Sequence, residues 1–194
     1  MRIGIFVFEG AEELDWVGPW EVLRMWALSW PDDEVEVVSV ARSPGVITCA
    51  KGLRVLPDHD WASVPPLDVL VYPGGRGTRP QLGDPEIRAW VSGLASNGAL
   101  ITSVCTGSLV LADAGLLKKR PATTHWGSLF ELAAIDPTVE IRPDDRFVDT
   151  GDVITAAGVS AGIDMALHLV ARLHSKERAV EVRRAIQYDP APPV

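Results

Sequence analysis

Cysteine is scarce in this chain, with only Cys49 and Cys105 among 194 residues. Two cysteines are too few for a disulfide framework, and their spacing in the sequence is not that of metal ligands. In a reducing cytosol both thiols are expected to stay free. The four histidines show no HxxxH or HxxE pattern of a zinc site. We therefore expect neither a metal ion nor any other cofactor.

Long apolar runs and an excess of positive charge are also missing. No run reaches 18 apolar residues, and the apolar stretch at 1–8 is too short for a signal sequence, lacks a cleavage site and leads into acidic residues. The net charge of -8 argues against a surface for nucleic acid or anionic membrane. We expect a cytoplasmic protein that acts on a small molecule, without nucleic-acid or membrane partners.

Apolar segments alternate with amphipathic segments along the chain. Strands are predicted at Ile3–Phe8, Val35–Val40, Val69–Tyr72, Leu100–Val104 and Val153–Ala156, with short edge strands within Arg120–Thr123 and Glu140–Asp149. Helices are predicted at Leu14–Leu28, Pro85–Ser96, Gly107–Ala114 and Val159–Leu173. Strands that alternate with helices imply a parallel sheet covered on both faces. We expect an α/β protein, a flavodoxin-like three-layer α/β/α sandwich with a mostly parallel sheet, as one domain over residues 1–188 and a Pro-rich surface tail at 189–194.

Cys105 lies where a buried strand turns sharply into a helix. In open α/β sheets, sites form at the carboxyl ends of the strands, which is where this residue stands. Gly107 and Ser108 keep the start of the helix slim, so the turn resembles a nucleophile elbow. The helix N-terminus predicts a depressed pKa for the Cys105 thiol and faster alkylation than at Cys49. The alternative is a small buried cysteine without a chemical role, which is common.

Two further loops lie at the same edge of the predicted sheet. The stretch Tyr72-Pro-Gly-Gly-Arg-Gly follows a strand, and its glycines allow N–H groups, that of Gly75 in particular, to face a ligand. A glycine-rich loop alone is more typical of a simple turn. Asp15, after the first strand, stands at the start of a helix, where aspartate commonly serves as an N-cap.

These stretches together resemble a known family. Leu-Asp-Trp-Val-Gly-Pro at 14–19, Tyr-Pro-Gly-Gly at 72–75 and Val-Cys-Thr-Gly at 104–107 are similar to the ThiJ/PfpI superfamily, relatives of the class I glutamine amidotransferases. Ala-Thr-Thr-His-Trp at 122–126 and the stretches at 155–169 and 187–193 extend the resemblance almost end to end. Asp15 together with Cys105-Thr106 is most similar to the isonitrile hydratases.

The resemblance implies a cysteine-dependent lyase that adds water to R–N≡C and releases the N-substituted formamide. Cys105 would attack the terminal carbon while Asp15 delivers a proton, which gives a thioimidate. Water would then add with the carboxylate as general base. Thr106 would hydrogen-bond between Asp15 and the thiol, and Gly75 would offer its N–H to Cys105 or to the developing oxygen.

The resemblance also implies residues around this centre. Trp16 and Trp126 would supply apolar surroundings that raise the pKa of Asp15. His125, although cysteine hydrolases often use a histidine base, is expected to line the pocket or to serve a structural role. Relatives usually pair, so a homodimer is expected.

Two other functions fit the same resemblance. Glyoxalase or deglycase enzymes also pair a carboxylate with an elbow cysteine, but resemble Glu with Cys-Ala or Cys-His. AraC-type regulators carry a similar ligand-sensing domain followed by a helix-turn-helix module. This acidic chain stops at Val194 after its last predicted helix, so we expect no DNA-binding module. Between a stand-alone sensor and an enzyme, the set of Asp15, Cys105 and Thr106 favours catalysis.

Overall fold

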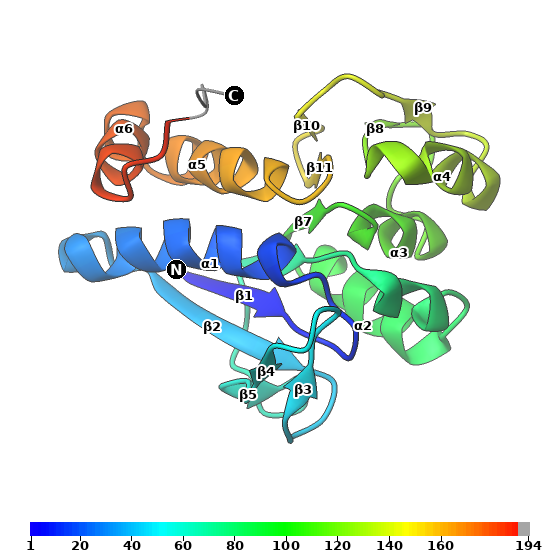
Figure 1. Ribbon diagram of the computed structural model, residues 1–194, viewed down its shortest axis with the longest axis horizontal. Coiled ribbons are helices and arrows are strands. Elements are labelled where there is room, and N and C mark those ends of the chain that lie inside the picture. Colours follow the sequence, from blue (N-terminus) through cyan, green and yellow to red (C-terminus); the bar gives the residue numbers. More distant parts are fainter. Residues whose placement is uncertain (190–194) are drawn as a thin grey trace.

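Seven strands form the main sheet of the computed structural model, which describes residues 1–189 (Figure 1). Their order is β10-β11-β7-β6-β1-β2-β5, and every neighbouring pair is parallel except β10 with β11. The strands are β1 (Arg2–Phe6), β2 (Glu36–Ala41), β5 (His59–Asp60), β6 (Val69–Tyr72), β7 (Leu100–Val104), β10 (Phe147–Asp149) and β11 (Val153–Ala156). The predicted mostly parallel sheet is confirmed. Of the predicted tail at 189–194, residues 190–194 lie outside the described residues.

Helices cover both faces of this sheet, which confirms the three-layer α/β/α sandwich (Figure 1). One face carries α1 (Glu13–Ser29), α5 (Ala161–Leu173) and α6 (Lys176–Ala185), and the other carries α2 (Pro85–Ser96) and α3 (Gly107–Asp113), with α4 (Leu129–Ile135) packed beside α3. Prediction missed α4, which is short, and α6, which has few apolar residues. No helix within residues 1–189 is long and apolar enough to cross a membrane.

Smaller elements complete the chain. A hairpin joins β3 (Ile47–Thr48) to β4 (Arg54–Val55), and a parallel pair joins β8 (Pro121–Ala122) to β9 (Glu140–Ile141). Short 3-10 helices lie at Pro31–Asp33 (η1), Arg76–Gln81 (η2) and Trp126–Ser128 (η3). The segment predicted as an edge strand at Glu140–Asp149 therefore divides into β9, outside the main sheet, and β10, on its edge.

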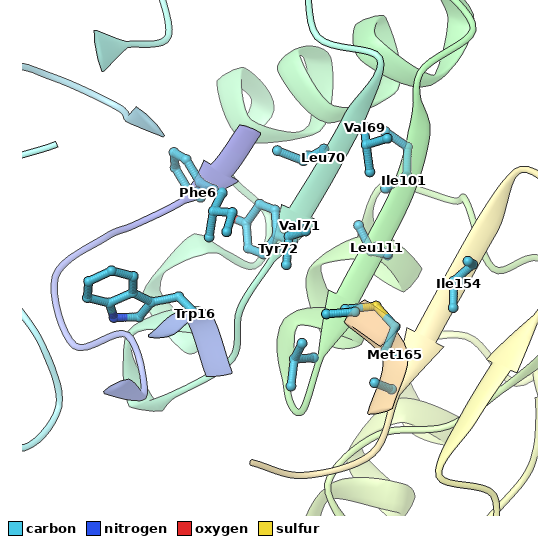
Figure 2. Close-up of a cluster of buried hydrophobic side chains, with 14 of the residues drawn as sticks. Phe6, Trp16, Val69, Leu70, Val71, Tyr72, Ile101, Leu111, Ile154 and Met165 are labelled. Atoms are coloured by element: carbon cyan, nitrogen blue, oxygen red, sulfur yellow. The ribbon is translucent and has the colours of Figure 1, made fainter. Parts of the chain in front are cut away.

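The central strands are buried on both faces because helices cover both, and their residues are mostly apolar. Every residue of β6 and β7 is buried, as expected for strands inside a parallel sheet. Figure 2 shows Val71, Ile101 and Ile154 from three neighbouring strands together with Leu111 from α3 and Met165 from α5. This core holds the strand ends, and hence the three loops at their carboxyl edge, in fixed positions.

Those loops meet at distances that only glycine allows. A Cβ added to Gly107 would lie 2.3 Å from the carbonyl oxygen of Tyr72. One added to Gly74 would lie 2.5 Å from the backbone nitrogen of Thr106 and 2.8 Å from the carboxylate of Asp15. The loop after β6 is thereby pressed against both the turn after β7 and the start of α1.

The Gly107→Ala variant is expected to lower the free energy of unfolding by about 1–3 kcal/mol, because the new methyl group meets backbone atoms that cannot rotate away. Gly93→Ala in α2 is the matched control, since a Cβ there meets no atom within 4 Å, and it should stabilise by about 0.8–1 kcal/mol through helix propensity. Urea unfolding of both variants measures the difference. Equal changes in the free energy of unfolding of the two variants would contradict the close approach of Gly107 to the Tyr72 carbonyl oxygen.

Candidate functional site

Cys105 occupies a strained backbone conformation directly after β7. Its φ is 56°, in the left-handed region that a residue with a side chain rarely adopts, and such a conformation costs on the order of 1–3 kcal/mol. Neighbouring groups hold it there. The Cys105 N–H donates to the carbonyl oxygens of Ala156 (3.1 Å) and Ala157 (3.0 Å), and its own carbonyl accepts from the hydroxyls of Thr124 (2.8 Å) and Ser108 (3.1 Å). The predicted strained elbow is confirmed.

Asp15 turns its carboxyl group inward rather than capping the helix. The N-cap of α1 is Glu12, so the interpretation of Asp15 as an N-cap is wrong. The Asp15 side chain is fully buried, and its Oδ2 accepts a hydrogen bond from the Gly74 N–H at 2.9 Å. Oδ1 is buried as well and has no partner of hydrogen-bond geometry among the described residues. Burial raises the pKa of Asp15 to about 7, and the Gly74 N–H and the neighbouring Cys105 thiol offset only part of this rise.

The Cys105 thiol is a weaker acid than the sequence predicts. Burial, and then the negative charge of Asp15, raises its pKa to about 12, although the N–H groups of Thr106 and Val159 favour the thiolate. The expected depressed pKa is therefore wrong, because desolvation and a neighbouring carboxylate outweigh the start of a seven-residue helix. Between these two pKa values, the Asp15–Cys105 pair holds one proton.

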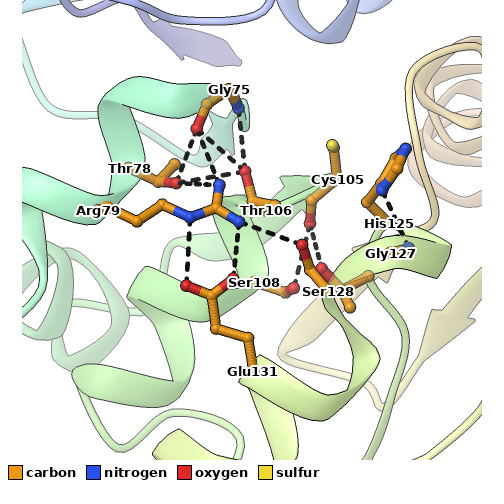
Figure 3. A network of polar contacts seen from close by, with 11 residues as sticks. Gly75, Thr78, Arg79, Cys105, Thr106, Ser108, His125, Gly127, Ser128 and Glu131 are labelled. Carbon is orange, nitrogen blue, oxygen red and sulfur yellow. Dashed lines mark hydrogen bonds and ion pairs between the residues drawn. The ribbon is translucent and has the colours of Figure 1, made fainter.

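Thr106 and Gly75 bind each other instead of the thiol (Figure 3). The Gly75 N–H donates to Thr106 Oγ1 at 3.0 Å, and this hydroxyl also lies 3.2 Å from both Thr78 Oγ1 and the Gly75 carbonyl oxygen. No hydrogen bond joins the Thr106 side chain to Asp15 or Cys105 within residues 1–189. Thr106 was expected to bridge Asp15 and the thiol, and the Gly75 N–H was expected to face Cys105 or the substrate. Both expectations are wrong, because the two residues bind each other and so tie the loop after β6 to the elbow.

A cavity of about 210 Å³ opens beside the elbow. It is lined by four of the predicted site residues: Gly75, Cys105, Thr106 and His125. Five further lining residues were not among the predicted site residues, although Arg76 lies in the glycine-rich stretch after β6 and Val159 in a stretch that carried the resemblance: Glu12, Arg76, Arg79, Ser128 and Val159. They converge only through folding, since they come from the start of α1, η2, η3 and the turn before α5.

His125 forms part of the cavity wall with a fixed ring. Its Nδ1 accepts a hydrogen bond from the Gly127 N–H at 3.1 Å (Figure 3). The Trp126 ring lies 5.4 Å from the imidazole, but it is 79% exposed and borders a neighbouring hollow rather than the cavity at Cys105. Trp16 lies in the hydrophobic core (Figure 2), beside the thiol of Cys49. Neither tryptophan lines the cavity.

The family of the chain follows from comparison with known proteins. The model of the DJ-1/PfpI family matches residues 1–172. The chain belongs to the DJ-1/PfpI family. This result confirms the resemblance to the ThiJ/PfpI superfamily. Within residues 1–189, no group of three or more His, Cys, Asp or Glu side chains is arranged to hold a metal ion.

Three DJ-1/PfpI proteins illustrate the range of relatives. An isonitrile hydratase of Pseudomonas putida is 38% identical over 194 residues, which cover 100% of this chain and 81% of the relative. A glutathione-independent glyoxalase of Caenorhabditis elegans is 28% identical over 175 residues, 88% of this chain and 87% of the relative. A crystal structure of a ThiJ/PfpI family protein from Pseudomonas syringae superposes with a TM-score of 0.86 at 34% identity, covering 100% of this chain and 77% of that one.

Iodoacetamide should alkylate Cys105 before Cys49, because burial raises the pKa of both thiols but only Cys105 borders the cavity, whereas Cys49 is fully buried. The rate at Cys105 should increase with pH as the thiolate forms. The Asp15→Asn variant should react several-fold faster near neutral pH, since it removes the negative charge that opposes the thiolate. Peptide mass spectrometry over a time course locates the label. Faster labelling of Cys49 would show that the elbow is closed to reagents.

Proposed function

We propose that this protein is an isonitrile hydratase, which adds water to R–N≡C and forms the N-substituted formamide. The observation that carries the proposal is the fully buried Asp15 carboxyl group, held by the Gly74 N–H at 2.9 Å next to the Cys105 thiol, which borders a small cavity. A terminal isonitrile carbon needs both a soft nucleophile and a proton, and this pair offers both. The full-length similarity to an isonitrile hydratase supports the same chemistry.

In the first step, the thiol adds across the isonitrile carbon. The Asp15 carboxylate takes the proton from Cys105 Sγ while the sulfur forms a bond to the carbon, and the same proton then passes to that carbon. The triple bond becomes a C=N double bond, and the product is the thioimidate R–N=CH–S–Cys105. Asp15 ends this step as a carboxylate again, so no external acid is consumed.

In the second step, water replaces the sulfur. Asp15 accepts a proton from water as the oxygen bonds to the thioimidate carbon, and this proton moves to the substrate nitrogen. The tetrahedral adduct R–NH–CH(OH)–S–Cys105 collapses when its C–S bond breaks. The leaving sulfur recovers the hydroxyl proton through Asp15, which restores the thiol and releases R–NH–CHO.

Glyoxalase chemistry is the second candidate, because a DJ-1/PfpI relative with that activity is similar over most of this chain. The same pair would then act on a 2-oxoaldehyde through a hemithioacetal at Cys105. Ligand sensing without turnover would use the same cavity but would produce neither formamide nor hydroxy acid. Parallel assays with an alkyl isonitrile and with methylglyoxal separate these three functions.

The proposal predicts a covalent intermediate on Cys105. Brief exposure of the protein to a small alkyl isonitrile should add the mass of one isonitrile, and digestion should locate it on Cys105. Cys105→Ala should show no adduct and no formamide, whereas Cys49→Ala should behave as the unmodified protein. Turnover of the isonitrile by Cys105→Ala would overturn the assignment of Cys105 as the nucleophile.

The Asp15→Asn variant should lose activity while keeping its fold. An asparagine oxygen still accepts the Gly74 N–H, but the amide cannot relay a proton. We expect kcat/KM for the isonitrile to fall roughly 10²-fold or more. In the unmodified protein, kcat/KM should rise with pH through about 7, where Asp15 becomes able to accept the thiol proton. Steady-state kinetics from pH 5.5 to 9 measure both, and near-normal turnover by Asp15→Asn would contradict the mechanism.

Unfolding experiments separate this loss from misfolding. The folded-state pKa of Asp15 is raised, so its protonated form contributes stability that is fully present below pH about 4 and is lost as pH rises to about 7. The loss amounts to about 4 kcal/mol for this shift. Relative to the unmodified protein, Asp15→Asn should therefore gain stability between pH 4 and pH 8. A pH-independent difference would show that Asp15 is not buried as a titrating carboxyl group.

A further inference from the structure

We propose that Arg76 binds a carboxylate carried by the substrate, so that the preferred substrates are short isocyano carboxylic acids. This inference rests on the proposed hydration of isonitriles and adds the class of the R group. The cavity of about 210 Å³ is below the 300–1,000 Å³ typical of sites for drug-sized ligands. The cavity is open to solvent, so the part of a substrate that it encloses is only a few heavy atoms besides the isocyano group, and the recognition of that part depends on the polar groups of the wall.

The charges of the cavity wall are paired with one exception. The guanidinium of Arg79 binds the carboxylate of Glu131, with Nη2–Oε2 at 2.6 Å and Nε–Oε1 at 3.1 Å (Figure 3). The carboxylate of Glu12 binds the Nζ of Lys51. The exposed Arg76 guanidinium has no hydrogen bond or ion pair to any group within residues 1–189. It is therefore the cation of this wall that is available to a ligand.

The backbone of Arg76 is held against the elbow. The preceding residue, Gly75, donates its N–H to Thr106 at 3.0 Å, and the following residue, Gly77, donates its N–H to the carbonyl oxygen of Gly10 at 3.1 Å. The side-chain stem is also close to Gly10, since a Cβ built on that glycine would lie 3.2 Å from Arg76 Cγ. Arg76 and Cys105 border the same small cavity, so one ligand of a few atoms reaches both.

The guanidinium group suits a carboxylate because its planar fork donates two parallel hydrogen bonds and stays charged at all relevant pH values. The two proposed chemical steps need no cation, since Asp15 performs every proton transfer. A carboxylate at Arg76 would orient the substrate with its isocyano carbon toward Cys105. Arg76 thus acts as a specificity-determining residue and takes no part in the bond changes.

A matched pair of substrates tests this inference: isocyanoacetate, which carries the carboxylate, and its methyl ester, which has the same isocyano group without the charge. We expect Arg76→Gln to lower the ratio of kcat/KM values, acid over ester, by about 10- to 100-fold, the range expected for removing a hydrogen-bonded partner of a charged group. The change should lie mainly in KM for the acid. Arg76→Lys, which keeps the charge without the fork, should recover part of the ratio.

Arg54→Gln is the control, since it removes the same charge from an exposed arginine that does not line the cavity; its ratio should equal that of the unmodified protein. If both substrates are hydrated and Arg76→Gln leaves the ratio unchanged, Arg76 is a solvated surface arginine and the inference is overturned while the proposed function stands. If the unmodified protein hydrates neither substrate nor any other isonitrile, the proposed function fails and the inference falls with it.

Discussion

A buried carboxylate held by a single backbone N–H is the constraint around which this site is organised. The Gly74 N–H meets Asp15 Oδ2 at 2.9 Å, and no cation lies close enough to form an ion pair with that carboxylate among the described residues. The contact requires glycine at position 74, because any side chain would collide with Thr106 and with Asp15 itself. It joins the loop after β6 to the first turn of α1, and the same loop is pressed against the elbow after β7. The loops after β1, β6 and β7 are therefore held in fixed positions relative to one another.

The arrangement lowers stability, and the proposed chemistry depends on it. Burial without a counter-charge raises the pKa of Asp15 into the neutral range and, through Asp15, helps to raise that of Cys105. Cys105 also holds a left-handed backbone conformation. At neutral pH the thiol of Cys105 therefore keeps its proton, and the proposed mechanism uses the Asp15 carboxylate as the base that removes it instead of a preformed thiolate.

The wall of the cavity is where the proposed selectivity would arise. Two of its charged side chains, Arg79 and Glu12, are bound to partners outside the cavity, whereas the Arg76 guanidinium has no partner among the described residues. The relatives of this chain include an isonitrile hydratase and a glyoxalase, and under the proposed function the residues around the elbow would select the small molecule. In this chain those residues come from η2, η3 and the turn before α5.

The sequence by itself determined the layers of the fold and the place of the elbow. The bounds of β6, β7 and β11 agree with prediction because strands buried on both faces form mostly apolar runs, which small polar residues such as Thr102 and Thr155 interrupt without ending. The bounds of α2 agree because Asp84 and Pro85 mark its start. Only the tertiary structure decided the electrostatics of the site. Whether Asp15 caps its helix or faces Cys105 depends on the loop that approaches it from 59 residues away. Likewise, two residues that are adjacent in the sequence can direct their side chains into different surroundings. Trp16 follows Asp15, and yet its side chain packs in the core beside Cys49. A pKa depends on burial and on charges brought together by folding, so the local signal of a helix N-terminus at Cys105 gave the wrong direction.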